Sequence, residues 1–334
     1  MSTETNACSA DPKCNRPKSF FKKNMKCYNM RMKQVIVAIV GRPSSGKSTF
    51  VNTITENKVS IVSSVPQSTL SMVKGIYENS DKRFVFLDTP GLYDSNVEFN
   101  KLLRKQSLNA IRECDCLLYM IDGKDKIKAE EEKAAFYVRT SGKPAVVLIN
   151  KSDLLGDGDE KRVRSFLTSA LKDCNQIHVG SAKNDEGLDD VLRALAEYAK
   201  EIESPNQNQN REDENPLPEF TESPVEFRIS ETIREAAFGN LMEEIPHAIC
   251  VICDDMSERE GTVTIKATIY CERESQKGII IGKAGSMIKK IKNSSIKGLK
   301  SIFPGRYVEI ELTVKVKKDW KRDKRILTKL GLIS

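Results

Sequence analysis

Short apolar runs alternate with amphipathic stretches through the first half of the chain, between Gln34 and Glu203. The apolar runs have the length of buried strands, and the stretches between them carry apolar residues at the three- and four-residue spacing of helices. The expected strands are 35–40, 74–77, 84–87, 117–121, 145–149 and 177–179. The expected helices are 48–55, 98–112, 129–140, 160–172 and 186–201. This alternation predicts a mainly parallel sheet with helices on both faces.

The pattern changes after the stretch 204–222, which is rich in Pro, Asn, Gln and acidic residues and predicts a linker. The expected order beyond it is a helix over 225–244, strands over 247–253 and 262–271, two helices around a Gly-x-x-Gly turn, a strand over 307–316 and a helix over 320–330. This order predicts a smaller α+β domain. We therefore expect one domain over 34–203 and a second over 223–334.

Composition adds the location of charge to this picture. The 334 residues are 39% hydrophobic, with 54 Lys and Arg against 47 Asp and Glu, which excludes collagen-like, coiled-coil and wholly disordered classes. No apolar run approaches the ~18 residues of a membrane-spanning helix. The net charge of +7 is concentrated, because residues 277–334 carry 16 basic and 4 acidic groups. A polyanion is the expected partner of this end of the chain.

The N-terminal segment and the cysteines each have two interpretations. Residues 1–33 carry 8 basic and 2 acidic groups without periodicity, so they are either a disordered basic arm or the result of a start assigned too early, with Met32 as one candidate start. The nine cysteines without an export signal indicate reduced thiols. Cys250 and Cys253, close to His247, suit either a packed strand or half of a metal site, and we expect the strand.

A phosphate-loop pattern follows the first expected strand. Residues 41–48 read GRPSSGKS and match G-x-x-x-x-G-K-[ST] between a strand and a helix. Gly41 and Gly46 let backbone N–H groups curl around phosphate oxygens. Lys47 is expected to bridge the β- and γ-phosphates, and the Ser48 hydroxyl to bind Mg²⁺. The predicted nucleotide-binding residues of this segment are Gly41, Arg42, Pro43, Ser44, Ser45, Gly46, Lys47, Ser48 and Thr49.

Three further motifs follow later strands at the same edge of the expected sheet. The Asp88 carboxylate is suited to the Mg²⁺ shell, and Asp153 can accept the N1–H and 2-amino hydrogens of guanine. The Ala182 N–H can donate to the guanine O6. Together with the phosphate loop they predict one GTP site, since these strand ends converge on one crevice. The nucleotide-binding residues predicted here are Asp88, Thr89, Pro90, Gly91, Asn150, Lys151, Asp153, Ser181, Ala182 and Lys183.

The second domain contains an RNA-binding pattern, in which an apolar helix, the turn Gly282-Lys-Ala-Gly285 and a lysine-rich helix over 287–300 follow one another. Glycines at both ends of the turn let backbone approach single-stranded RNA, and lysines supply counter-charge. This is the signature of a KH domain. The predicted RNA-binding residues are Lys277, Ile279, Ile280, Ile281, Gly282, Lys283, Ala284, Gly285, Lys289 and Lys290.

The four nucleotide-site motifs resemble the translation-factor-like class of GTPases. The resemblance implies a first switch over 65–73, in which Thr69 supplies a second Mg²⁺-binding hydroxyl, and a second switch over 91–99. Leu92 occupies the position of the glutamine that orients water in Ras-type enzymes, so we expect slow hydrolysis assisted by a group supplied elsewhere. The catalytic candidates are Lys47, Thr69 and Gly91, and the metal ligands are Ser48, Thr69 and Asp88.

The combination of the two domains resembles the Era family of bacterial ribosome-assembly GTPases. Matching segments include NKVSIVS over 57–63, SETIR over 230–234, ESQKGIII over 274–281 and VKVKKDW over 314–320. Many relatives bind K⁺ through a phosphate-loop asparagine, and because Ser44 stands there, potassium activation is left open. The expected fold is an α/β P-loop GTPase domain followed by a KH type II domain.

The Era resemblance implies a GTP-hydrolysing, RNA-binding protein that acts in small ribosomal subunit assembly with a GTP/GDP switch. It also implies cofactors and partners. These are GTP, GDP and Mg²⁺ as cofactors, and the 3′ end of small-subunit ribosomal RNA and the assembling small subunit as partners. A monomeric cytoplasmic protein is expected, with contact to an anionic membrane surface as a further possibility. The alternatives are an RNA-binding scaffold in which GTP is structural, and another GTPase connected with ribosomes or tRNA.

Overall fold

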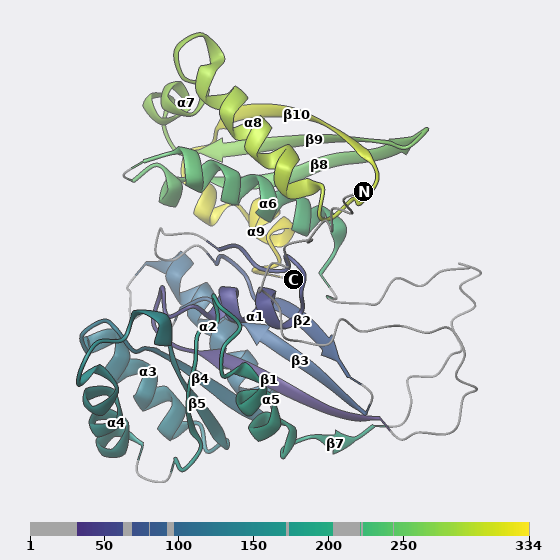
Figure 1. Cartoon of the computed structure of the whole chain (residues 1–334). Coiled ribbons are helices and arrows are strands. Elements are labelled where there is room, and N and C mark those ends of the chain that lie inside the picture. The colour runs from purple at the N-terminus through teal and green to yellow at the C-terminus, as the bar shows by residue number, and fades with distance from the viewer. Residues whose placement is uncertain are drawn as a thin grey trace, which may run out of the picture. The chain divides into compact units, whose positions relative to one another are not determined.

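The carboxyl ends of five parallel strands lie at one edge of the first sheet, and the predicted nucleotide-binding motifs follow these ends. In this computed structural model the strands are β1 (Lys33–Val40), β2 (Val73–Glu78), β3 (Lys82–Asp88), β4 (Cys116–Asp122), β5 (Ala145–Asn150), β6 (Ile177–Val179) and β7 (Lys200–Glu201). Their order is β2-β3-β1-β4-β5-β6, with β7 beside β1 (Figure 1). β2 and β7 are antiparallel to their neighbours and the other pairs are parallel. The predicted mainly parallel sheet is confirmed.

The structure describes residues 32–62, 69–79, 81–91, 97–171, 174–202, 221, 223–242 and 244–333. The expectations for the basic arm 1–33 and the linker 204–222 fall almost entirely outside these residues, as do positions 65–68 of the first expected switch and positions 92–96 of the second. In the part of the chain that is described, no helix is both long enough and apolar enough to cross a bilayer.

Helices cover the first sheet on both faces, as alternation of strands and helices requires. They are α1 (Lys47–Ile54), α2 (Glu98–Glu113), α3 (Ala129–Thr140), α4 (Asp159–Ala170) and α5 (Leu188–Ala196). Phe50 of α1 and Val191 of α5 pack in one apolar cluster with β1. Ile111 of α2, Ala134 of α3 and Val163 of α4 belong to the cluster on the opposite face.

The end of the fifth helix differs from its prediction. The expected helix over 186–201 is shorter, because α5 begins at Leu188 after the left-handed Gly187 and ends at Ala196. Lys200 and Glu201 instead pair with Gln34 and Lys33 at the start of β1. A two-residue strand without an apolar residue has no periodic signal, so only its pairing with β1 reveals it.

The second sheet has three strands with helices packed on it, in the order α–β–β–α–α–β of a KH type II domain. Its elements are α6 (Val225–Asn240), β8 (Cys250–Arg259), β9 (Thr262–Cys271), α7 (Glu274–Ile281), α8 (Ser286–Leu299) and β10 (Tyr307–Val316), followed by α9 (Lys324–Lys329). The strand order is β10-β9-β8, with β9 and β10 parallel. The predicted fold class is confirmed.

Several boundaries in this second part differ from expectation. The strand expected over 247–253 begins only at Cys250, because Pro246–Ala248 forms a 3-10 turn. It continues to Arg259, since pairing with β9 carries it beyond its buried half. The helix expected over 320–330 is divided into a 3-10 turn over Trp320–Arg322 and the helix α9. The Asp323 carboxylate starts α9 as its N-cap, because it accepts hydrogen bonds from Arg325 N and Ile326 N.

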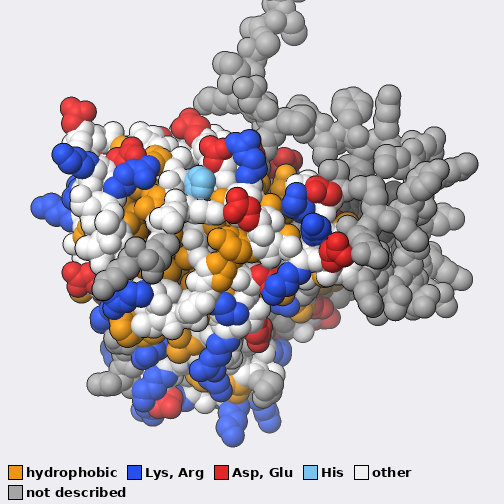
Figure 2. Space-filling model, turned by 90° about the horizontal axis from the view of Figure 1, so that it is seen from below, with side chains coloured by type: hydrophobic (Ala, Val, Ile, Leu, Met, Phe, Trp, Pro, Cys, Tyr) orange, Lys and Arg blue, Asp and Glu red, His pale blue; other side chains and the backbone are white. Residues whose placement is uncertain are grey.

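One face of the molecule has a mixed charge. Figure 2 shows Lys and Arg side chains interspersed with Asp and Glu side chains and with separate hydrophobic areas on one face of the molecule. A mixture of this kind is typical of a solvated protein surface.

Candidate functional site: a nucleotide crevice and a glycine-bounded turn

The phosphate loop lies between β1 and α1. Gly46 has φ +99°, a backbone conformation that side chains rarely adopt, and a Cβ placed there would lie 2.2 Å from Asn150 Nδ2. Lys47 Nζ donates hydrogen bonds to the carbonyl oxygens of Gly41 and Arg42, both at 3.0 Å. Burial lowers the pKa of Lys47, while the nearby Asp88 and Glu131 carboxylates act in the opposite direction. These two carbonyl oxygens therefore hold the Lys47 ammonium group at the mouth of the phosphate loop.

Asp88 and Ser48 meet at the end of β3. Ser48 Oγ donates to Asp88 Oδ2 at 2.7 Å. Asp88 is fully buried, and its Oδ1 accepts no hydrogen bond from any residue that the structure describes. Burial raises the pKa of Asp88, although the charge of Lys47 lowers it. A buried, unsatisfied carboxylate oxygen beside a serine hydroxyl fits a hard divalent cation such as Mg²⁺.

Asn150 braces the two halves of the crevice. Its Nδ2 donates to Ser45 O of the phosphate loop at 2.7 Å, and its Oδ1 accepts from Ala182 N at 2.8 Å. Asn150 is only 2% exposed. One amide thereby connects the phosphate loop to the segment after β6, so its oxygen and nitrogen are both occupied in structural roles.

The expected guanine-recognition residues lie on the far side of Asn150. Ser181 Oγ donates to Asp153 Oδ1 at 2.6 Å and also accepts from Asn184 N at 3.2 Å. The Asp153 side chain is exposed, whereas Ser181 and Ala182 are buried. The hydroxyl holds the carboxylate in one orientation and leaves Oδ2 for a base. Lys183 is exposed and has no bond to this group in the described ranges.

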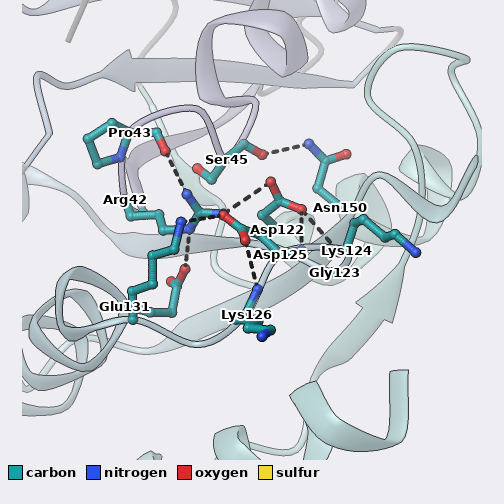
Figure 3. Close-up of polar contacts among 12 residues, drawn as sticks. Arg42, Pro43, Ser45, Asp122, Gly123, Lys124, Asp125, Lys126, Glu131 and Asn150 are labelled. Carbon is teal, nitrogen blue, oxygen red and sulfur yellow. Dashed lines mark hydrogen bonds and ion pairs between the residues drawn. The ribbon is translucent and has the colours of Figure 1, made fainter. Parts of the chain in front are cut away.

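A charge cluster behind the phosphate loop went unpredicted. The guanidinium of Arg42 contacts carboxylate oxygens of Asp122 at 3.1 Å, Asp125 at 2.9 Å and Glu131 at 3.1 Å (Figure 3). Tyr119 Oη donates to Glu131 Oε1 at 2.7 Å, and burial raises the pKa of Glu131. Arg42 therefore contributes its backbone to the loop while its side chain points into the protein. The partners lie about eighty residues away in sequence, so no local motif reveals them.

The predicted switch residues are only partly described. Thr69 is half-buried before β2 and makes no hydrogen bond to Ser48 or Asp88 in the described ranges. Thr89 Oγ1 donates to Ile39 O at 2.9 Å, and Pro90 O accepts from Ser107 Oγ, which fixes the chain just before Gly91. Gly91 is buried, and Leu92 lies outside the described residues. The assignment of Thr69 as a metal ligand stays a prediction.

The turn between α7 and α8 depends on its two glycines. Gly282 has φ +73° and ψ 171°, and a Cβ there would lie 2.7 Å from Met287 Cβ and 2.8 Å from Met287 N. Gly285 has φ +74°, with Ile288 Cγ2 at 3.9 Å from the same position. Ala284 also has a positive φ of 50°. The backbone thus makes a tight, exposed bend that starts α8.

The isoleucines before this turn have different environments, which corrects the prediction for one of them. Ile279 is 50% exposed and Ile281 is half-buried, but Ile280 is fully buried in the apolar core of the second sheet. Ile280 therefore cannot contact bases as expected, because successive helical residues point about 100° apart. Lys283, Lys289 and Lys290 are exposed, and Lys277 is half-buried with its Nζ 3.9 Å from Glu274.

The cysteines near His247 are packed in β8. Cys250 is fully buried and Cys253 is 7% exposed. Burial raises the pKa of Cys253 to about 11 and that of Cys250 further still. Both sulfurs are therefore protonated at neutral pH, in keeping with the expected role as apolar strand residues.

Two family models match the chain. One, described as 50S ribosome-binding GTPase, matches residues 36–151, and one described as KH domain matches residues 244–321. The first match spans β1 to β5 of the first sheet and the second spans all three strands of the second sheet, in the order that the sequence motifs predict.

Curated relatives and solved structures match almost the whole chain. GTPase Era of Thermotoga petrophila is 36% identical over 305 residues, which are 91% of this chain and 98% of that protein. GTPase Era of Borreliella burgdorferi is 35% identical over 90% of this chain and 99% of that protein. A structure of an Aquifex aeolicus Era variant bound to GDP and AlF₄⁻ has a TM-score of 0.82 and 29% identity over 91% of this chain and all of that one. Era in complex with MgGDPNP and nucleotides 1506–1542 of 16S ribosomal RNA has the same TM-score and coverage and 30% identity.

Proposed function

The chain belongs to the GTPase Era family, and on that basis we propose that it is a GTP-switched RNA-binding protein of small ribosomal subunit assembly. In this proposal the first domain binds and slowly hydrolyses GTP, and the KH domain binds the 3′ end of small-subunit ribosomal RNA. The observation that carries it is the brace formed by Asn150, which joins a phosphate loop to a guanine-recognition segment within one crevice.

The residues of the crevice divide the chemistry of phosphoryl transfer among them. Mg²⁺, held by the Ser48 hydroxyl and the shell around Asp88, would neutralise charge on the β- and γ-phosphates. Lys47 would exchange its two carbonyl partners for phosphate oxygens. Thr69 and the Gly91 N–H would complete the γ-phosphate contacts. Because Leu92 offers no polar group to a water molecule, hydrolysis is expected to be slow until RNA or a protein partner contributes one.

Replacing Asp153 by asparagine is expected to exchange guanine for xanthine. The substitution removes the negative charge and one of the two oxygens that can accept the base hydrogens, and weakening two charge-assisted hydrogen bonds corresponds to about 100-fold or more in affinity. The new amide can donate to the 2-oxo group of xanthine. Fluorescence titration with GDP and XDP should therefore show reversed preference in Asp153→Asn. Asp157→Asn, an exposed neighbour, serves as the matched control, and an unchanged GDP affinity in Asp153→Asn would remove Asp153 from guanine recognition.

RNA binding is proposed for the turn Gly282–Gly285 and the exposed lysines Lys283, Lys289 and Lys290. The similar Era structure, with 16S nucleotides 1506–1542, supports the 3′ end of small-subunit RNA as the target. Ile279 offers the exposed apolar surface for bases. The ring centroids of Phe99, the last residue of the second switch, and Trp320, after β10, lie 5.5 Å apart, which gives the end of that switch a direct contact with the second domain.

The RNA affinity is expected to depend on the nucleotide. With a non-hydrolysable GTP analogue we expect binding of a 3′-terminal small-subunit RNA fragment to be at least about fivefold tighter than with GDP, the usual range of coupling between sites. Fluorescence anisotropy measures this directly. A large-subunit RNA fragment of equal length is the control, because one matching family model is described as 50S ribosome-binding. Equal affinities with both nucleotides would favour the alternative, a scaffold in which GTP is structural, and multiple-turnover phosphate release would then decide whether it is an enzyme.

The remaining parts of the proposal concern organisation and location. We propose a GTPase domain over 34–203 joined through 204–222 to an RNA-binding domain over 223–334. We also propose that the protein is a cytoplasmic monomer. Peripheral contact with an anionic membrane surface is part of the proposal, and the +12 net charge of residues 277–334 supports that contact.

A further inference from the structure

The charge cluster around Arg42 includes the buried carboxylate of Asp122, to which the proposed function assigns no role. Asp122 is the last residue of β4 and is only 5% exposed. Its register partner on β5 is Asn150, the brace of the crevice. The carboxylate of Asp122 therefore lies at the carboxyl edge of the sheet, one strand away from the guanine-recognition loop and beside the phosphate loop.

One oxygen of Asp122 is shared by both loops. Its Oδ2 accepts a hydrogen bond from Lys151 Nζ at 2.6 Å and lies 3.1 Å from Arg42 Nη2. Arg42 belongs to the phosphate loop, and Lys151 belongs to the segment that carries Asp153. The carboxylate thus forms a second connection between the two loops, independent of the Asn150 amide.

The other oxygen of Asp122 fixes the carboxylate itself. Its Oδ1 accepts from Lys124 N at 3.0 Å and from Asp125 N at 3.2 Å. These bonds lie in the turn that follows β4, which is drawn with Arg42 and Glu131 in Figure 3. Because the turn holds Oδ1, Oδ2 has a fixed direction, and the cations that it binds have fixed positions as well.

Arg42 connects Asp122 to Lys47, the phosphate-binding lysine. The carbonyl oxygen of Arg42 accepts from Lys47 Nζ, while the guanidinium is held by three carboxylates, of which only Asp122 also holds Lys151. The side chain of Arg42 is 9% exposed, so water cannot easily replace these partners. A displacement of Asp122 would therefore move both the phosphate loop and the base loop.

We propose that Asp122 is a positioning residue for guanine-nucleotide retention, which ties the phosphate loop to the base-recognition loop through Arg42 and Lys151. This rests on the proposed function, since it assumes that the crevice binds guanine nucleotide. Release of nucleotide requires the two loops to separate from the phosphates and the base. A carboxylate that bonds a cation from each loop opposes that separation without contacting the nucleotide.

The test replaces Asp122 by asparagine in the full chain. The amide keeps the size of the side chain and its backbone contacts through Oδ1 but presents an N–H group to two cations. We expect release of a fluorescent GDP analogue to be about tenfold faster, the loss expected for one charge-assisted hydrogen bond. Asp125→Asn is the matched control, because Asp125 binds Arg42 and Lys128 but not Lys151, and its release rate should stay within about twofold of the wild type.

A double variant separates positioning from a general loss of stability. Arg42→Lys retains a cation for Glu131 but lacks the fork that reaches Asp122, so it is expected to speed release as well. If both residues act through one connection, the Arg42→Lys/Asp122→Asn protein releases GDP no more than about twofold faster than Asp122→Asn alone. Rate increases that multiply would overturn the proposal. So would an unchanged rate in Asp122→Asn, or equal increases in Asp122→Asn and Asp125→Asn.

Hydrogen exchange of the wild-type protein decides the matter if Asp122→Asn fails to fold. GDP binding should slow exchange of the Lys124 and Asp125 amides, since both donate to Asp122 Oδ1. Amide exchange at these positions that is insensitive to GDP would overturn the proposal. Failure of the wild-type protein to bind the GDP analogue at all would instead contradict the proposed function, so the two failures are distinguishable.

Discussion

Gly46→Ala is expected to cause a severe loss of GDP affinity, the largest effect on nucleotide binding predicted for this chain. The new methyl group would lie 2.2 Å from Asn150 Nδ2, in a backbone conformation that already disfavours alanine. Relief of this overlap moves Asn150 away from Ser45 O and Ala182 N, so the phosphate and guanine sides are disturbed together. Loss of two or more charge-assisted phosphate contacts corresponds to on the order of 100-fold or more in GDP affinity. Isothermal titration with GDP and Mg²⁺ measures it.

Gly142→Ala is the matched control for this result. Gly142 also has a positive φ, of 68°, but nothing lies within 4 Å of its Cβ position. It should lose about 1 kcal/mol of stability through backbone strain and keep its GDP affinity. A GDP affinity in Gly46→Ala equal to that of Gly142→Ala would mean that the contact with Asn150 is not essential to the crevice.

Gly282→Ala is expected to damage the KH domain more than Gly285→Ala, although both glycines belong to the same motif. At Gly282 the added carbon meets Met287 Cβ and N at less than 3 Å, in a backbone region that is close to glycine-only. Strain and overpacking together predict a loss of about 3 kcal/mol in the free energy of unfolding, with a large decrease in RNA affinity. Denaturant unfolding and anisotropy with the RNA fragment give the two quantities.

Gly285 and Gly305 serve as controls for the Gly282→Ala prediction. Gly285→Ala has only the cost of its φ of +74°, about 1 kcal/mol, because its nearest neighbour is 3.9 Å away. Gly305 has the same φ with open space around it and lies outside the turn, so Gly305→Ala should lose similar stability and retain RNA binding. Equal stability losses at all three positions would show that the close approach to Met287 relaxes without cost.

Sequence periodicity predicts the strands and helices of the first sheet well because each apolar run is local. The segment 129–140 and the segment 177–179 have the expected bounds. The phosphate loop is also local, since its glycines, lysine and serine lie within eight residues. In both cases the residues that determine the structure lie within a few positions of each other in the sequence.

The rest of the site depends on contacts between distant residues. The ion pair between Arg42 and Glu131 joins a loop to a helix far along the chain, and charged residues at such separations have no spacing to recognise. The isoleucine triplet 279–281 shows the converse limit. Three apolar residues in a row do not reveal which one faces the core, and only packing against the second sheet identifies Ile280.

The short strand β7 also has a consequence for the chain that follows it. β7 is paired with the start of β1, and Thr221 Oγ1 donates to Lys74 O of β2 at 2.6 Å, so both ends of the segment 202–220 are attached to the first sheet. The described residues on either side of this segment, Glu201 and Thr221, are therefore both anchored to the first sheet. Because the entropy of loop closure changes by only about 0.6 kcal/mol for each doubling of length, insertions and deletions here should be nearly neutral for stability. Changes in the length and composition of this segment should therefore alter the free energy of unfolding very little.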